Sequence, residues 1–123
     1  MSMNIELNYK LWLEKKEKVF GPGPARILEL VDEFGSLHRA ASEMDMSYSQ
    51  AWHLIRELEE RLGFSLLESK AGGKSGGGSQ LTEAGRELLR RFRSFESRAG
   101  AELENLAAEH FSRDFFAELT DGS

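Results

Sequence analysis

Apolar and polar side chains alternate near the N-terminus, and a repeat of two residues is typical of a strand with one buried face. The charged run EKKEK at 14–18 then predicts a solvated hairpin turn, and Val19 with Phe20 predicts a short return strand. We therefore expect an N-terminal β-hairpin that covers one side of a helical core. The alternating apolar residues are Ile5, Leu7, Tyr9, Leu11 and Leu13.

The apolar spacing changes to that of a helix after the two Gly-Pro pairs. Pro24 suits the first helical residue, because a proline there loses no helical hydrogen bond, and Gly35 suits a left-handed stop. We therefore predict a first helix from Pro24 to Phe34. The residues on its apolar face are Ile27, Leu28, Val31 and Phe34.

A second helix is predicted immediately afterwards. Ser36 can cap it, and Ala40 with Ala41 are small enough to let another helix cross closely. Asp45 tolerates left-handed backbone and is expected to end the helix.

A third helix is predicted to begin only a few residues later. Ser47 and Gln50 form an S-x-x-Q capping box, and the apolar period runs to Leu62, where Gly63 can close the helix. Two capped helices joined by so short a link predict a helix-turn-helix.

The third helix has two faces. One is an apolar stripe at helical spacing, which we assign to the core: Ala51, Leu54, Ile55, Leu58 and Leu62. The other can exchange hydrogen bonds with bases or phosphates, although a plain solvated surface is the alternative: Tyr48, Ser49, Gln50, His53 and Arg56. Trp52 is open to two interpretations, of which core packing is favoured over a nucleic-acid contact.

The glycine-rich stretch 71–78 lies between two short apolar strands, predicted at 64–67 and 79–81, with Thr82 as the next helix cap. A strand, a glycine tip and a return strand after a helix-turn-helix form a wing, on which Lys70 and Lys74 would face a DNA backbone or minor groove. A flexible linker fits less well, because a linker separates independent cores. A nucleotide-binding phosphate loop is excluded, because it requires a glycine five residues before Gly73 and that position is occupied by Glu68.

One long helix is predicted from Glu83. Its apolar stripe exceeds what a small winged domain needs, which suggests pairing with the same helix of a second subunit. Gly100 favours a bend or break, and the Phe-rich residues after it form either a short final helix or a partner-binding tail. The arginines at 86, 90 and 93 form a solvated flank or, as the alternative, a phosphate-facing ridge. The stripe consists of Leu88, Phe92, Phe95, Ala99, Leu103 and Leu106.

Composition narrows the possible functions. The chain of 123 residues has no cysteine, which removes disulfides and thiolate chemistry, and its three histidines lack metal-ligand spacing. The absence of a long apolar run and of a signal-peptide pattern predicts a cytoplasmic protein. The net charge of −5 argues against a polyanionic partner. Residues 36–95, however, carry nine Lys/Arg against eight Asp/Glu, so the acidity lies in the two ends and the middle can still meet nucleic acid.

Taken together, GPGPARILELVDEFGSLHRAASEMDMSYSQAWHLIRELEERLGFSLLE and GGKSGGGSQLTEAGRELL resemble the DNA-binding domain of molybdate-responsive ModE-type regulators, and more loosely that of LysR-type regulators. The resemblance implies a winged helix-turn-helix with a long dimerisation helix, a two-fold operator, and contacts from the third helix and wing. Members of that family carry molybdate-binding domains, whereas about 40 residues follow Leu81 here, so we expect a DNA-binding module without that sensor.

The predicted fold class is mainly α with small β-hairpins. We expect a winged DNA-binding domain at 1–95 and a helical dimerisation extension at 96–123. The predicted function is a homodimeric transcriptional regulator of double-stranded DNA; the alternative is a protein-interaction module on the same scaffold. We expect no enzyme activity, cofactor, metal, membrane association or small-molecule effector. The expected DNA contacts are Ser47, Tyr48, Ser49, Gln50, His53, Arg56, Lys70 and Lys74.

Overall fold

A computed structural model of the chain describes residues 5–70 and 78–121. They belong to two compact units, of which the larger covers Leu11–Arg93 and the smaller joins the N-terminal residues to those from Ser94 onward. In its described residues the larger unit holds three helices, the first part of a fourth, and two small antiparallel hairpins, so the predicted class, mainly α with small β, is confirmed.

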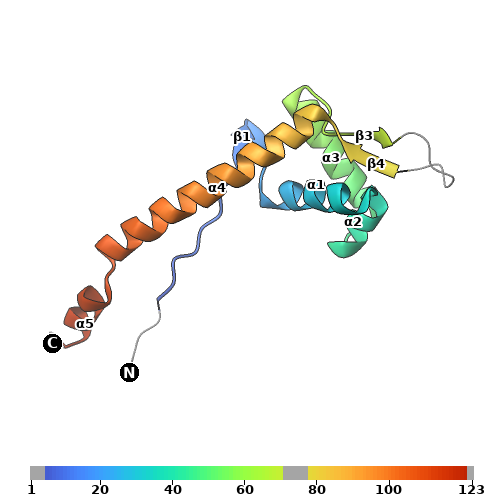
Figure 1. Cartoon of the computed structure of the whole chain (residues 1–123). Helices are drawn as coiled ribbons and strands as arrows, with labels where there is room; N and C mark the ends of the chain where they lie inside the picture. Colours follow the sequence, from blue (N-terminus) through green and yellow to red (C-terminus); the bar gives the residue numbers. More distant parts are fainter. Residues whose placement is uncertain (1–4, 71–77, 122–123) are drawn as a thin grey trace. The chain divides into compact units, whose positions relative to one another are not determined.

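The three helices of the larger unit are α1 (Pro22–Phe34), α2 (Leu37–Glu43) and α3 (Tyr48–Leu62), shown in Figure 1. The predicted caps at Ser36, Gly35 and Gly63 are confirmed. Gly35 and Gly63 adopt left-handed backbone with φ of 68° and 86°, and the Ser36 hydroxyl accepts a hydrogen bond from the Arg39 amide. The predicted end of the second helix at Asp45 is wrong by two residues, because α2 ends at Glu43, although Asp45 does take the left-handed conformation. Local capping chemistry therefore fixes most of these helix ends.

The predicted start of α1 at Pro24 is wrong, because the helix begins at Pro22 with Gly21 as its cap. Both prolines fit, since the first four amides of a helix have no partner within it and a missing N–H costs nothing there. Pro24 is also buried, which places it on the core side of that first turn.

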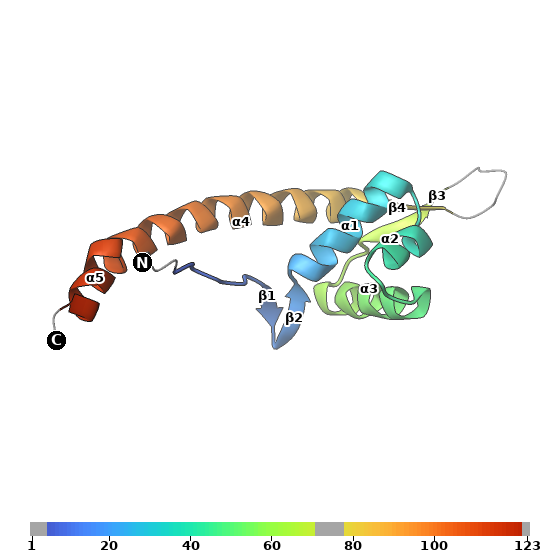
Figure 2. The same cartoon turned by 90° about the horizontal axis from the view of Figure 1, so that it is seen from below.

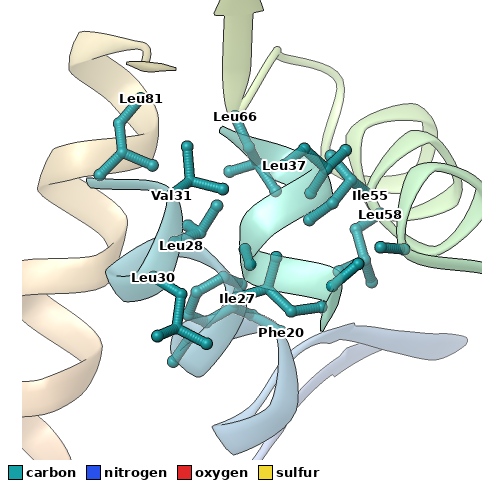
Figure 3. Packing of buried hydrophobic residues seen from close by; sticks show 14 of the residues in the cluster. Phe20, Ile27, Leu28, Leu30, Val31, Leu37, Ile55, Leu58, Leu66 and Leu81 are labelled. Carbon is teal, nitrogen blue, oxygen red and sulfur yellow. The ribbon is translucent and has the colours of Figure 1, made fainter. Parts of the chain in front are cut away.

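The core of the larger unit lies between the three helices and the two hairpins, and Phe92 of the fourth helix also belongs to it. Figure 3 shows Phe20, Leu37, Ile55 and Leu81 around α1, whose inner face is almost fully buried. The inward stripe of α3 is confirmed, with Ala51, Ile55 and Leu58 buried and Leu54 and Leu62 packed at the edge of the cluster.

The N-terminal hairpin is much shorter than expected. Strand β1 (Leu13–Lys15) pairs with β2 (Glu17–Phe20), and Lys16 at the turn has a φ of 67°. The predicted strand from Ile5 to Leu13 is wrong, since residues 5–12 have no regular secondary structure. The reason is that the turn lies close to α1, so the returning strand is too short to pair with residues before Leu13.

A second hairpin, β3 (Leu67–Lys70) and β4 (Gly78–Leu81), forms the wing, with β4 beside α1 (Figure 1, Figure 2). The first predicted strand, at 64–67, begins late, because Phe64 is exposed in the bend after Gly63 and Leu66 packs in the core. The Thr82 cap is confirmed: its hydroxyl accepts from the Gly85 amide and donates to the Ser65 carbonyl.

Helix α4 (Glu83–His110) is a single continuous helix, followed by α5 (Arg113–Asp121). A break at Gly100, one of the two expected forms, is wrong, and the Tyr9 hydroxyl occupies the space that a side chain on Gly100 would need. The Phe-rich tail forms a short helix. Whether that helix folds back on a dimer or binds another partner stays a prediction. In the part of the chain that the structure describes, no helix is long and apolar enough to cross a bilayer.

Candidate nucleic-acid interface

The turn between α2 and α3 is held by backbone hydrogen bonds. The Met46 amide donates to the Ala41 carbonyl at 2.9 Å, and Asp45 takes the left-handed conformation with φ of 54°. Met44 and Met46 pack against the core cluster on the inner side of this turn. The turn therefore fixes α3 relative to α2 and leaves the first turns of α3 at the surface.

The capping box at the start of α3 is present as predicted. The Ser47 hydroxyl accepts from the Gln50 amide at 3.0 Å, and the Gln50 side-chain oxygen accepts from the Ser47 amide at 2.9 Å. These bonds use the acceptor side of both groups. The hydroxyl proton of Ser47 and the NH₂ group of Gln50 remain as donors, at the end of the helix where the backbone dipole attracts anions.

The outward face of α3, which we define as Tyr48, Ser49, Gln50, Trp52, His53 and Arg56, is exposed along its whole length. Tyr48 lies flat against His38 of α2, with ring centroids 3.8 Å apart and an interplanar angle of 10°. This stack limits the freedom of the Tyr48 ring while its side chain stays 40% exposed.

Trp52 lies on this face rather than in the core, so the favoured core assignment is wrong. Its side chain is 41% exposed, and it contacts the edge of His53 at 5.2 Å and the guanidinium of Arg56 at 5.3 Å between centres. The sequence contains the signal for this placement. Trp52 follows Tyr48 by four residues and precedes Arg56 by four, which places it in one row with two predicted contacts.

Glu59 connects α3 to the base of the wing. Its Oε2 accepts from the amides of Leu66 at 2.6 Å and Leu67 at 3.2 Å, and its Oε1 lies 3.7 Å from the Arg56 guanidinium. Sequence reasoning missed this residue, because its partners are backbone amides of the next element and backbone amides carry no residue-specific pattern.

Lys70 ends β3, opposite Gly78 in the register of the wing. A Cβ placed on Gly35 would lie 3.7 Å from its Nζ, so the ammonium lies near the C-terminal end of α1, where the helix dipole favours a cation. The Ser79 amide donates to the Gly35 carbonyl at 3.0 Å and attaches the wing to the same corner. Lys74, the other predicted wing contact, lies outside the described residues.

The α4 arginines bind carboxylates, as expected of a flank rather than of a phosphate ridge. Arg86 pairs with Asp32 at 2.9 Å and Arg93 with Glu29 at 2.7 Å, joining α4 to α1.

Arg90 and Arg91 both hold Glu87. Hydrogen bonds from Arg90 and then Arg91 lower the pKa of the Glu87 carboxyl to about 2, and the bond between Arg90 and Glu87 raises the pKa of Arg90.

Among residues 5–70 and 78–121, no three His, Asp or Glu side chains lie close enough together to hold a metal ion.

The chain matches the family described as "Bacterial regulatory helix-turn-helix protein, lysR family" over residues 25–86. It is 35% identical over 82 residues to the molybdenum transport protein ModE of Azotobacter vinelandii, covering 67% of this chain and 30% of that protein. It is 34% identical over 80 residues to the transcriptional dual regulator ModE of Escherichia coli K12, covering 64% and 30%. The chain thus spans about 30% of the length of these curated relatives.

A crystal structure of the CbnR DBD–DNA complex has the same fold, with a TM-score of 0.53 at 28% identity. The match covers 68% of this chain and 94% of that one. The winged helix-turn-helix fold and the resemblance to ModE-type and LysR-type regulators are therefore confirmed.

Proposed function

This chain belongs to the lysR family of bacterial regulatory helix-turn-helix proteins, and from that premise we propose that it is a sequence-specific DNA-binding transcriptional regulator. It binds a two-fold operator as a homodimer, with one α3 in the major groove of each half-site. The observation that carries the proposal is the outward face of α3, where aromatic and hydrogen-bonding side chains are held at the surface by the capped start of the helix.

The start of α3 positions the protein on a phosphate. Ser47, Ser49 and Gln50 offer hydroxyl and amide donors there, and a helix N-terminus is itself a favourable place for a phosphate. Such contacts set the register of the helix on the duplex without choosing a sequence.

Base recognition comes from Tyr48 in the first turn of α3 and from His53 and Arg56 in the turns that follow. Arg56 can present two N–H groups to guanine O6 and N7, which is the commonest specific contact in the major groove. The side chain of Arg56 is 63% exposed, so its donors are accessible.

The wing adds contacts to the flanking backbone or minor groove through Lys70 and Lys74. Residues 11–93 hold thirteen Lys/Arg and thirteen Asp/Glu, whereas residues 1–10 and 94–123 hold three and eight. The DNA-binding unit is thus neutral overall, and binding depends on where its cations lie rather than on net charge.

Dimerisation is assigned to residues 96–123, and DNA binding to residues 1–95. In the smaller unit Phe95, Leu106, Phe111, Phe115 and Leu119 are all exposed, and a second copy of α4 and α5 would cover them.

We place the protein in the cytoplasm with the DNA it regulates, and assign it no catalytic activity, cofactor or effector.

The test is selection of bound sequences from a random duplex library by the purified chain, at two salt concentrations. We expect a two-fold motif with half-sites about 34 Å apart, one turn of DNA. If Lys70 and Lys74 of two protomers each neutralise a phosphate, the logarithm of affinity falls with that of salt with a slope of about −4.

The matched variants are Arg56→Ala and Arg91→Ala, two exposed arginines of which only the first lies on α3. Arg56→Ala lowers affinity for the selected motif far more than for random DNA, and Arg91→Ala changes neither. Enrichment of no sequence at either salt would contradict the proposal and favour a protein-interaction module on the same scaffold.

A further inference from the structure

Trp52 and Arg56 form a pair on the outward face of α3. The Arg56 guanidinium carbon lies 5.3 Å from the centre of the Trp52 ring, within the roughly 6 Å over which a cation and an aromatic face attract. Both side chains are exposed, so this contact is not a by-product of core packing.

Glu59 forms a second contact with the Arg56 guanidinium. Two backbone amides at the base of the wing hold its Oε2, and its side chain is only 11% exposed. The Glu59 Oε1 is 3.7 Å from Arg56 Nη1, a loose ion pair. The Arg56 guanidinium therefore lies near both an aromatic ring and a carboxylate that two backbone amides hold, although long arginine side chains at a surface are usually free to change rotamer.

We propose that Trp52 is a positioning residue that holds the Arg56 guanidinium in the orientation that contacts guanine O6 and N7 in each half-site. The inference rests on the proposed DNA-binding function. A bidentate contact needs the plane of the guanidinium to be set before DNA arrives, and an aromatic face sets it because a guanidinium stacks on it.

Direct contact of Trp52 with DNA would also use an exposed ring, and a double-mutant cycle separates the two roles. The variants are Trp52→Leu, Trp52→Phe, Arg56→Ala and the double variant Trp52→Leu with Arg56→Ala. Affinities are measured on the operator selected by the parent chain and on copies in which each half-site guanine in turn is 7-deazaguanine, which lacks the N7 acceptor.

We expect Trp52→Leu to lower affinity at least about fivefold, because one arginine side chain in each of two half-sites must then be ordered on binding. Trp52→Phe, which keeps an aromatic face, stays within about twofold of the parent. The Trp52→Leu change has little effect once Arg56 is alanine. One 7-deazaguanine position lowers parental affinity and leaves the Arg56→Ala variant unaffected.

A second measurement needs no DNA. In the free protein the Trp52 ring current shifts the NMR signals of the Arg56 Hδ and Hε protons upfield, and Trp52→Leu abolishes that shift while Trp52→Phe retains part of it. Circular dichroism and urea unfolding show whether each variant remains folded.

Four outcomes would overturn the inference. They are an unshifted Arg56 in the free parent protein, an unchanged affinity in Trp52→Leu, an equal loss from Trp52→Leu with and without Arg56, and insensitivity to every 7-deazaguanine. In the last three cases a selected motif would still stand, so the DNA-binding proposal survives the failure of this one. Absence of any motif would refute the proposed function itself.

Discussion

Gly85, in the first turn of α4, is the glycine whose replacement tests the packing of the wing base most directly. A Cβ added there would press on the Leu66 carbonyl oxygen and lie 3.1 Å from Leu66 C and Cα. These are backbone atoms, so a side-chain rotation cannot relieve the contact. We therefore predict that Gly85→Ala destabilises the protein, although alanine is the better helix former.

The magnitude follows from opposing terms. The gain in helix propensity is about 1 kcal/mol. Overpacking costs about 1–3 kcal/mol. If α4 retreats instead, it weakens the bond from the Thr82 amide to the Leu66 carbonyl, at 2.9 Å, and that from the Thr82 hydroxyl to the Ser65 carbonyl, at 2.6 Å. Each of those bonds is worth about 1 kcal/mol. Either cost is about 2 kcal/mol and exceeds the gain in helix propensity, so the net destabilisation is about 1 kcal/mol.

The assay is thermal and urea unfolding followed by circular dichroism. A loss of about 1 kcal/mol lowers the melting temperature of a domain of this size by about 4–8 °C. The matched control is Gly100→Ala in the same helix, where the added methyl meets only the flexible end of Tyr9. We expect this control to be neutral or slightly stabilising. A Gly85→Ala protein as stable as the parent would refute the reasoning.

Four further changes have predictable effects. Ser47→Ala removes the acceptor for the Gln50 amide and should cost about 1 kcal/mol in urea unfolding; no loss would show that the capping box is not formed in solution. Glu59→Ala leaves two backbone amides without their carboxylate and should cost about 1–3 kcal/mol, with faster hydrogen exchange at those amides as the specific sign. Phe92→Ala removes a buried ring that meets Phe20 edge-on at 5.2 Å and should cost about 3–5 kcal/mol. The control Phe64→Ala removes an exposed ring and should change stability by only about 0.5 kcal/mol; similar losses would contradict the burial pattern.

The fourth change concerns pH. Because the folded pKa of Glu87 is lowered from 4.5 to about 2, its ionised form stabilises the fold above pH 4.5, and that contribution is lost as pH falls toward 2. Glu87→Gln should therefore be less stable than the parent at pH 6, with a difference that shrinks on acidification and in high salt. NMR titration of the Glu87 carboxyl measures the pKa directly, and an ordinary value near 4.5 would contradict the ion pairs with the arginines.

Local chemistry predicts much of the larger unit. Ser36, Ser47 with Gln50, Gly35 and Gly63 bound the helices where the structure has them, because each satisfies backbone groups within a few residues of itself. The short apolar strands on either side of the glycine-rich stretch, together with the Thr82 cap, likewise predict the wing before any tertiary contact is known. Most of the expected contact residues on α3 also follow from helical period, since one face is apolar and the other is not.

The errors arise where a residue's state depends on distant partners. Alternation at residues 5–13 indicates a strand, but a strand needs a second strand to pair with, and the short return from Lys16 to α1 provides only a few residues. Tryptophan is usually buried, so Trp52 is expected in the core. The core-facing side of α3 is instead occupied by Ala51, Ile55 and Leu58, which leaves the indole at the surface. Glycine at 100 weakens a helix in isolation, whereas here the Tyr9 hydroxyl fills the space beside it.

The sequence by itself thus determines the helix-turn-helix and its wing, because helix caps, turns and amphipathic period depend on neighbours along the chain. Only the tertiary structure decides that Glu59 binds the base of the wing, that His38 supports Tyr48 and that Trp52 meets Arg56 at the surface. Burial and contact belong to the packed volume rather than to any single segment, so these features become defined only when the helices and hairpins are assembled.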